Sequence, residues 1–124
     1  MPLYTAITED GSLSDEKKAK IAKEITRIHT SVMKVPSNFV RVVFLSYPKG
    51  SGFTAGKMAP TAALNCVLRC GHSEVEKSDT LKQLWAMFHD LTGIPTEQLT
   101  ISLQEIASSN AMEMGQIMPS VSQK

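Results

Sequence analysis

The feature that most constrains this chain is a weak internal repeat. The segment that begins at Pro36 aligns without gaps with the segment that begins at Pro95. Apolar positions upstream of the two prolines coincide as well, since Ile25 aligns with Leu84. The sequence therefore predicts two copies of a strand–helix–strand unit, each about 60 residues long.

The first copy shows the pattern of each expected element. Residues 3–8 predict a strand, and Ser14 is placed as a helix N-cap. Isoleucine and valine then recur at steps of three and four until Pro36, which predicts an amphipathic helix. Residues 38–47 are almost continuously apolar, so we expect a strand buried on both faces. A loop is expected from there to Pro60.

The second copy repeats this order with weaker signals. Residues 62–70 predict a strand, and the next helix is expected to begin near Ser78 and to end at Gly93. Residues 98–106 alternate apolar and polar residues, which indicates a strand with one exposed face. The tail over residues 108–119 predicts one short helical turn or strand.

Together these elements predict an α/β fold in a single domain spanning residues 1–124. Tandem βαβ repeats form one four-stranded sheet, with two helices on one of its faces. A chain with only two long helices cannot also cover the other face. We therefore expect oligomers.

Charge and hydropathy exclude some classes of partner. The 13 Lys and Arg residues against 12 Asp and Glu give a net charge of +1, without the basic excess of a general nucleic-acid binder. No apolar run approaches the roughly 20 residues that span a bilayer, and the first residues do not start a signal peptide. We therefore expect a soluble, cytoplasmic protein that binds neither nucleic acid nor membranes.

The two cysteines predict neither a disulfide nor a metal site. Cys66 and Cys70 lie four residues apart on one predicted strand, which is too far for a disulfide bond. The pair also lacks the second pair of ligands that a zinc site needs. No metal or cofactor is therefore expected.

Pro2 follows the initiator methionine, so removal of Met1 would leave a secondary amine at the chain terminus. An α-amino group has a reference pKa of about 7.7–8.0, and burial or nearby cations lower that pKa toward neutrality. Such an amine can transfer protons at pH 7. Proteins also begin with Met-Pro without any such role, so the position alone leaves both interpretations open.

Other polar residues could take part in binding or catalysis, but each also has an alternative structural explanation. Arg69 ends an apolar strand, where it could bind a carboxylate through paired hydrogen bonds or form a surface salt bridge. His29 and His72 could help Arg69 to bind that carboxylate. Alternatively, His29 could be a histidine at the border of the core, and His72 a loop histidine. Glu113 lies among apolar residues, either as a buried carboxylate or facing solvent.

These residues occur within short motifs in a characteristic order. The motifs are Pro2-Leu-Tyr, Ala22-Lys-x-Ile-Thr-x-x-His29, Leu68-Arg69-x-Gly71, and Glu113-x-Gly115 followed by Pro119. In this order the chain resembles the tautomerase superfamily, and within it most closely the cis-3-chloroacrylic acid dehalogenase group. The resemblance extends over nearly the whole chain.

The resemblance implies a homotrimer built from βαβ repeats, with Pro2 as the catalytic amine. It also implies that His29 and Arg69 bind the carboxylate of a small substrate. Glu113 matches the acid that activates water in the dehalogenase.

Two positions depart from the dehalogenase pattern. The dehalogenase has a second arginine where this chain has His72, and a tyrosine where it has Ser102. Since His72 can be neutral at pH 7, we expect weaker carboxylate binding that depends more on pH. Ser102 lacks the phenol that would help to position water. Both changes argue against dehalogenation.

Three functions remain as hypotheses. The first is a tautomerase, in which neutral Pro2 converts 2-hydroxy-2-enoates into 2-keto acids while Arg69 and the histidines hold the carboxylate. The second is a hydratase or cis-3-haloacrylate dehalogenase, in which cationic Pro2 donates a proton and Glu113 activates water. The third is a non-catalytic trimeric binding protein that retains Met1.

Overall fold

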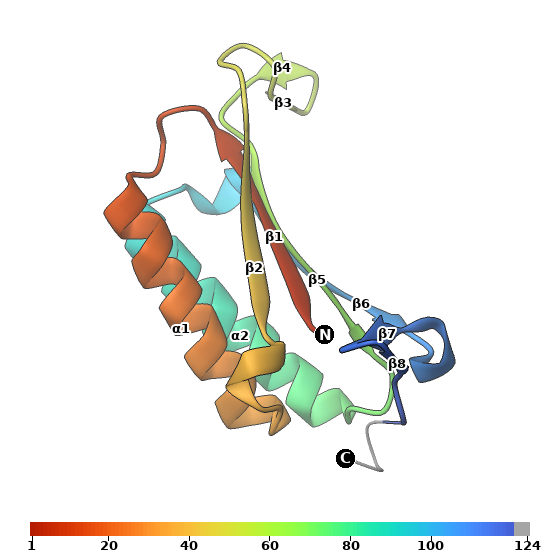
Figure 1. Cartoon of the computed structure of the whole chain (residues 1–124). Helices are drawn as coiled ribbons and strands as arrows, with labels where there is room; N and C mark the ends of the chain where they lie inside the picture. Colours follow the sequence, from red (N-terminus) through yellow and green to blue (C-terminus); the bar gives the residue numbers. More distant parts are fainter. Residues whose placement is uncertain (121–124) are drawn as a thin grey trace.

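The computed structural model describes residues 1–120, so the last four residues of the predicted domain lie outside the described residues. One mixed sheet carries two helices on one face, as predicted (Figure 1). The strands, in sheet order, are β2 (Arg41–Tyr47), β1 (Leu3–Glu9), β5 (Ala62–Arg69) and β6 (Leu99–Ile106). The helices are α1 (Asp15–Met33) and α2 (Glu74–Thr92). Strand β1 runs parallel to β2 and antiparallel to β5, while β5 runs parallel to β6.

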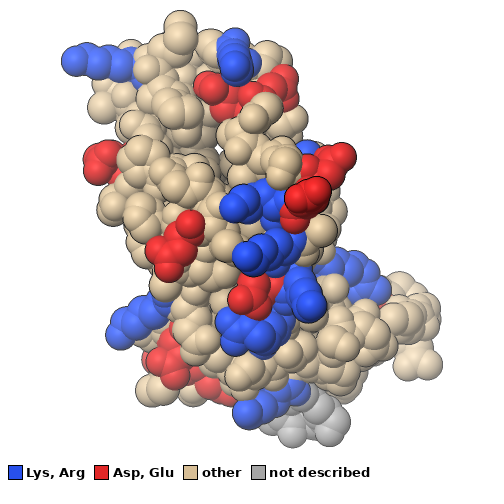
Figure 2. Space-filling model, turned by 90° about the vertical axis from the view of Figure 1, so that its left-hand side faces the viewer, with Lys and Arg blue, Asp and Glu red and all other residues tan. Residues whose placement is uncertain are grey.

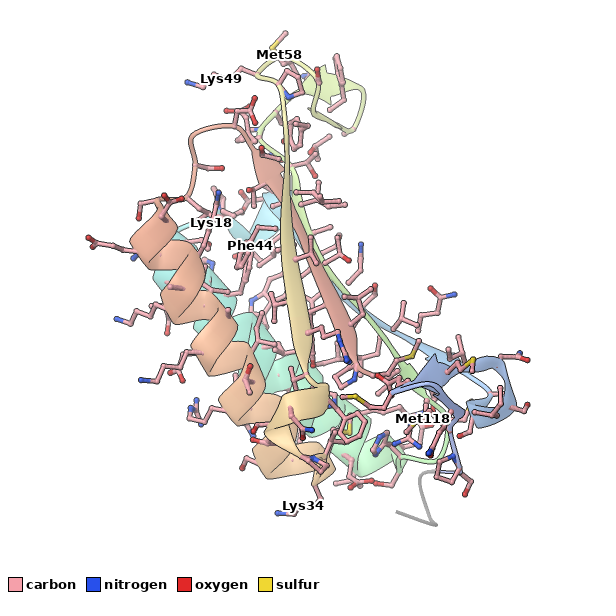
Figure 3. All side chains as sticks on the ribbon, in the orientation of Figure 1. Lys18, Lys34, Phe44, Lys49, Met58 and Met118 are labelled. Carbon is pink, nitrogen blue, oxygen red and sulfur yellow. The ribbon has the colours of Figure 1, made fainter. Side chains whose placement is uncertain are left out.

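Short elements connect and extend this layer. Three 3-10 turns are η1 (Ser37–Phe39), η2 (Thr96–Gln98) and η3 (Ser108–Asn110). Two hairpins are formed by β3 (Phe53–Thr54) with β4 (Lys57–Met58), and by β7 (Met112–Glu113) with β8 (Gln116–Ile117). The hairpins lie at opposite ends of the sheet, as Met58 and Met118 indicate in Figure 3.

The first hairpin corrects the prediction of a plain loop before Pro60. Ala55 and Gly56 both adopt positive φ, at 53° and 78°, and so turn the chain back on itself within two residues. Met114 and Gly115 form the same turn in the second hairpin. An alanine and a methionine at left-handed positions are weak turn signals, because most side chains disfavour positive φ.

The internal repeat holds, with a spacing of 59 residues in the helices and the hairpins. Helix α1 begins at Asp15 and α2 at Glu74, and the same spacing separates the ends of the two helices. It also relates the starts of the two hairpins. The sheet register relates β1 to β5 by 60 residues instead, since Leu3 pairs with Arg41 as Ala63 pairs with Thr100. The second half is therefore a structural copy of the first.

Helix caps agree with the prediction for α1 but not for α2. Ser14 caps α1, with its side chain accepting a hydrogen bond from the Lys17 amide. The N-cap of α2 is Ser73, not Ser78, because Ser73 and Glu76 form a reciprocal capping box that satisfies two amide groups. Gly93 ends α2 with a φ of 69°, as predicted.

The core lies between the helices and the sheet, and the predicted apolar stripes of both helices face it. Its fully buried members include Tyr4, Ala6, Ile21, Ile25, Ile28, Leu64, Leu68, Leu84 and Phe88. Phe44 of β2 packs against this core from the edge of the sheet (Figure 3). Cys66 is buried and Cys70 is exposed, and both are free thiols.

The opposite face of the sheet is open, so the prediction that β2 is buried on both faces is wrong. Val42 and Phe44 pack against the helix-side core, whereas Val43 and Leu45 are 44% and 52% exposed. Strand β2 is an edge strand, and neither helix covers this face. Only every second residue of the apolar run in β2 therefore contributes to the core.

The surface over α1 carries lysine and arginine interspersed with aspartate and glutamate (Figure 2). Within residues 1–120, no helix is both long enough and apolar enough to span a bilayer.

Candidate active site at the amino terminus

The amino terminus lies where β1 begins, beside the hairpin of β7 and β8 (Figure 1). The side chain of Pro2 is fully buried here. A pocket of about 340 Å³ surrounds this point, lined by Met1, Pro2, Leu3, Arg41, Met112, Glu113 and Met114. The second hairpin therefore forms one wall of the pocket, and the starts of β1 and β2 form the other.

Glu113 connects the two walls of this pocket. Its Oε1 atom accepts a hydrogen bond from Arg41 Nη1 at 3.1 Å and also contacts the amino group of Met1. The side chain is only 7% exposed. Its second oxygen, Oε2, is buried without a hydrogen-bond partner. This oxygen is an unused acceptor beside the amino terminus.

Burial controls the protonation of the amino terminus. Desolvation, followed by the positive charges of Arg41 and Arg69, lowers the pKa of the Met1 amine to about 6. Glu113 acts in the opposite direction, because a carboxylate in contact with an amine favours its charged form. The net direction is downward, so a large share of the amine is uncharged at pH 7.

Arg69 lies at the carboxyl end of β5, at the predicted strand end. It is buried, and its Nη1 donates a hydrogen bond of 2.6 Å to the carbonyl oxygen of Pro119. Its positive charge contributes to the lowered pKa of the Met1 amine, after burial and Arg41. The segment after β8 therefore holds a guanidinium close to the pocket.

The two predicted histidines do not line the pocket. His29 is fully buried in the last turns of α1, where its Nδ1 lies 2.7 Å from the phenol oxygen of Tyr4. His72 precedes the N-cap of α2, and its Nδ1 lies 3.9 Å from a carboxylate oxygen of Glu76. Both side chains are buried.

Ser102 stands apart from these residues. It lies in the middle of β6 on the open face of the sheet, where its hydroxyl donates a 2.9 Å hydrogen bond to Asn65. Within one chain the structure does not bring Ser102 to the amino terminus.

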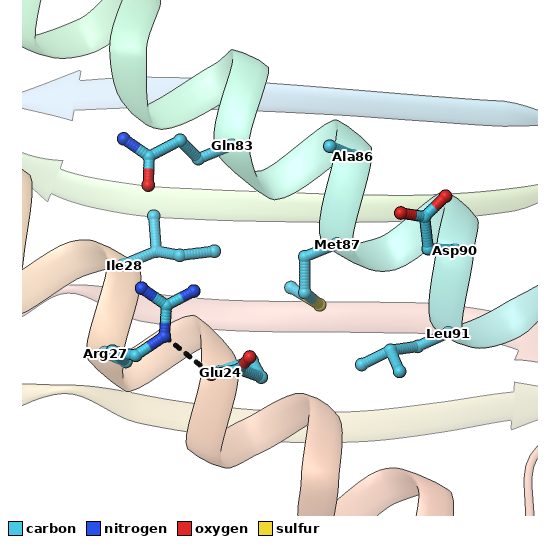
Figure 4. A pocket seen from close by; sticks show the side chains of 8 residues that line it. All are labelled: Glu24, Arg27, Ile28, Gln83, Ala86, Met87, Asp90 and Leu91. Atoms are coloured by element: carbon cyan, nitrogen blue, oxygen red, sulfur yellow. Dashed lines mark hydrogen bonds and ion pairs between the residues drawn. The ribbon is translucent and has the colours of Figure 1, made fainter.

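A second depression lies between the two helices (Figure 4). Its volume is about 380 Å³, and it is lined by Glu24, Arg27, Ile28, Gln83, Ala86, Met87, Asp90 and Leu91. None of the predicted site residues lines it. Arg27 pairs with Glu24 at 2.7 Å within the same helix.

The sequence profile of the Tautomerase_3 family, described as "Putative oxalocrotonate tautomerase enzyme", matches residues 1–121. The chain belongs to this family.

Solved structures agree with this assignment, while a search of curated proteins found no match. Native Ps01740 is 31% identical, with 90% of this chain and 99% of that chain covered and a TM-score of 0.87. N1, a member of the cis-3-chloroacrylic acid dehalogenase family, is 26% identical, with coverage of 98% and 86% and a TM-score of 0.92. A fused 4-OT symmetric trimer shares the fold at 17% identity, with 94% of each chain covered and a TM-score of 0.85. The resemblance to the tautomerase superfamily is therefore confirmed.

In this tautomerase-family chain, sequence reasoning missed Arg41. It was treated as part of a buried apolar strand, but it begins β2 and pairs with Leu3 in the parallel register of β1 and β2. That register places it beside Pro2. A charged residue at the start of an apolar strand, next to a predicted terminal amine, was the signal that could have found it.

Proposed function

We propose that this protein is a cofactor-independent keto–enol tautomerase that acts on 2-hydroxy-2-enoates, with Pro2 as the general base after removal of Met1. The pKa of the Met1 amine, lowered to about 6 by burial, Arg41 and Arg69, is the observation that carries the proposal, because the same surroundings would act on Pro2 once Met1 is removed. A base must be neutral to accept a proton, and an amine with this pKa is mostly neutral at pH 7. Pro2 is fully buried, so desolvation also acts on its nitrogen once that nitrogen is terminal.

In this mechanism the nitrogen of Pro2 takes the proton of the enol hydroxyl and returns a proton to carbon 3, which yields the 2-keto acid. The reaction is an isomerisation and needs no other reactant. Arg69 holds the substrate carboxylate, and the proposal gives the same role to His29 and His72, although neither lines the pocket of the single chain. Arg41 adds positive charge where negative charge develops on the substrate oxygen.

We propose that the active form is a homotrimer. The open sheet face exposes Val43 and Leu45, which a neighbouring subunit would cover. A trimer of the same fold is found in the fused 4-OT structure. Ser102, on the same open face, would then approach the pocket of an adjacent subunit.

A hydratase or cis-3-haloacrylate dehalogenase is the second candidate. The buried Oε2 of Glu113 favours it, since an unpartnered carboxylate oxygen beside the amine can accept a proton from water. In that reaction Pro2 is cationic and protonates the substrate. His72 and Ser102, in place of an arginine and a tyrosine, count against it. A trimeric binding protein without activity is the third candidate, and it requires that Met1 be retained.

The decisive experiment is the ketonisation of phenylenolpyruvate, followed by absorbance. Intact mass first establishes that Met1 is absent. Pro2→Ala should lower kcat/KM by roughly 10²–10⁴-fold, the usual contribution of a general base. Equal rates for both proteins, or no activity in either, contradict the tautomerase proposal. Turnover of cis-3-chloroacrylate would then support the second candidate, and its absence the third.

A further inference from the structure

The pocket at the amino terminus combines a charged pair with an apolar wall. Arg41 and Glu113 are the charged residues that line it, and their side chains pair at 3.1 Å. Leu3, Met112 and Met114 line it with apolar side chains. The volume of about 340 Å³ lies at the small end of the range for small-molecule sites, roughly 300–1,000 Å³. The pocket therefore fits a small molecule that has both a charged group and an apolar group.

The hairpin of β7 and β8 presents the apolar wall to solvent. Met112 and Met114 are each 63% exposed, whereas the side chain of Glu113 between them is buried. Ile117, which pairs with Met112 across the hairpin, is exposed as well. Exposed apolar side chains that are contiguous mark binding surfaces. Methionine is unbranched and adapts its shape, and its sulfur packs favourably against aromatic rings, so this wall suits a flat apolar group.

Met114 occupies a backbone position that its side chain disfavours. Its φ is 53°, in the left-handed region, where a tight hairpin turn favours asparagine, aspartate or glycine. The corresponding residue of the first hairpin is Ala55, which shares this φ but has no side chain beyond Cβ. The turn therefore does not need a long side chain here. A long side chain that is kept at a strained position and lines a pocket points to a role in that pocket.

The charges around the pocket match one carboxylate. The positive charge of Arg41 is balanced by Glu113, and an amino terminus with a lowered pKa is largely uncharged at pH 7. Arg69 supplies a further positive charge that acts on the amino terminus. Residues 107–120, which include the hairpin, contain no lysine or arginine. A second carboxylate along the hairpin would therefore meet Glu113 and no cation of this segment, which is costly when water is excluded.

We propose that the substrate of this protein is a monocarboxylate whose carbon 3 carries an apolar group, with an aromatic ring as the best fit. The apolar group lies against Met112 and Met114, which are the specificity-determining residues, and Leu3 adds a contact from β1. Dicarboxylates are poor ligands, which includes the oxalocrotonate of the family description. This substrate class rests on the proposed tautomerase function.

The first test locates the ring of a bound ligand. Processed protein with ¹³C-labelled methionine methyl groups is titrated with 3-phenylpropanoate, a saturated acid that neither a tautomerase nor a hydratase converts. Met112→Leu and Met114→Leu assign the two methyl signals by their loss. We expect saturable ring-current shifts at both signals and none at Met58, which is exposed in the other hairpin. Propanoate, which has no ring, should not cause these shifts. If neither Met112 nor Met114 shifts with 3-phenylpropanoate, the proposal is wrong.

The second test compares affinities. Wild-type protein should bind 3-phenylpropanoate about tenfold more tightly than propanoate, because the ring leaves water. It should bind 3-(4-carboxyphenyl)propanoate, which adds a carboxylate to the same ring, more weakly than 3-phenylpropanoate. Glutamine has nearly the length of methionine but is polar, so Met112→Gln combined with Met114→Gln should reduce the tenfold preference to about threefold or less. Met58→Gln is the matched control and should retain the full preference. An unchanged preference in the double variant, or a diacid that binds as tightly as the monoacid, overturns the proposal.

These measurements separate the ligand class from the proposed reaction, since saturated acids bind without turnover. Absence of ketonisation in a processed protein whose Met112 and Met114 methyl groups respond contradicts the proposed function and leaves the ligand class in place. Ketonisation by a protein whose methionines do not respond supports the function and overturns the ligand class.

Discussion

The amino terminus is surrounded by groups that act on its proton in opposite directions. Arg41 and the desolvation of the site favour the neutral amine, whereas Glu113 favours the ammonium form. Arg41 and the amine share the same oxygen of Glu113, so each ion contact weakens the other. The choice between base and acid catalysis is therefore set by a few charges within one pocket.

The pH dependence of kcat/KM follows from this balance. The burial and the arginines that lower the pKa of the Met1 amine would also act on the Pro2 nitrogen once it is terminal, so the pKa of that base should lie below its usual value. We therefore expect kcat/KM to rise about tenfold per unit at low pH, where the base is protonated, and to level off above the lowered pKa. The profile is measured with phenylenolpyruvate on processed protein. A profile that falls through this region would indicate a proton donor and favour the hydratase.

Removal of the Arg41 charge should move that profile. Arg41→Gln removes a positive charge that lowers the pKa of the amine and leaves Glu113 to the amine alone. Both effects raise the pKa, so the rising limb should shift to higher pH. The control is Arg27→Gln, which neutralises an exposed arginine on α1 outside the pocket. If the rising limb of the pH profile does not shift in Arg41→Gln, Arg41 does not control the pKa of the amine.

At the scale of single residues, the sequence indicates the type and position of a polar group but not which other groups lie beside it. Arg69 was placed at a strand end, and Glu113 was left as either a buried or a solvent-facing carboxylate; the structure gives both side chains a buried location. Arg41 was missed because its role depends on the parallel pairing of two strands that are distant in the sequence. The roles of His29, His72 and Ser102 stay predictions.

At the scale of elements, the repeat would have corrected the start of α2. Ser14 caps α1, and the residue 59 positions later is Ser73, the observed cap. Ser78 was chosen because the apolar stripe of α2 only begins after it, while the first turns of the helix are polar. Periodicity detects the buried part of a helix, and capping decides where the helix starts.

The two serines can be compared directly. Ser73→Ala removes the capping box and should lower the free energy of unfolding by about 1 kcal/mol. Ser78→Ala lies inside the helix, where alanine is the better helix former, and should be neutral or slightly stabilising. Both are measured by urea unfolding at equal protein concentration. Equal losses for the two variants would contradict the observed cap.

Thr80 is a weak point in the packing of α2. It is fully buried, and its hydroxyl has no hydrogen-bond partner, while the corresponding residue of α1 is Ile21. Thr80→Val keeps the shape and removes the unsatisfied group, so it should raise the free energy of unfolding by roughly 1 kcal/mol. Thr26→Val is the control, because the Thr26 hydroxyl already donates to the carbonyl of Ala22. A loss of stability in Thr80→Val would show that the hydroxyl has a partner in the assembled protein.

At the scale of the whole molecule, the open sheet face shows which part of residue burial depends on the single chain and which part depends on an assembly. The apolar run of β2 correctly predicted a strand, but the exposure of Val43 and Leu45 could not follow from it. Composition does not reveal whether an apolar residue is covered by its own chain or by another. The need for a partner was inferred from the number of helices alone.

The trimer proposal predicts which exposed apolar residues matter. Leu45→Glu places a charge on the open face and should shift the protein from trimer to monomer in sedimentation velocity. Val75→Glu is the control, since Val75 is 70% exposed in the first turn of α2, where an acidic residue is favourable. A trimer that survives Leu45→Glu rules out this face as the main contact.

The internal repeat does not duplicate the reactive amine, and this determines how many such amines an assembly contains. Duplication copied the strands, the helices and the hairpins, but a chain has only one amino terminus. The sheet register makes Ala62 the position that corresponds to Pro2, since Leu3 pairs with Arg41 as Ala63 pairs with Thr100. The nitrogen of Ala62 is a peptide amide, and Arg41 and Glu113 correspond to Thr100 and Thr54. An electrophile selective for secondary amines should therefore saturate at one equivalent per chain, although the fold offers two equivalent ends.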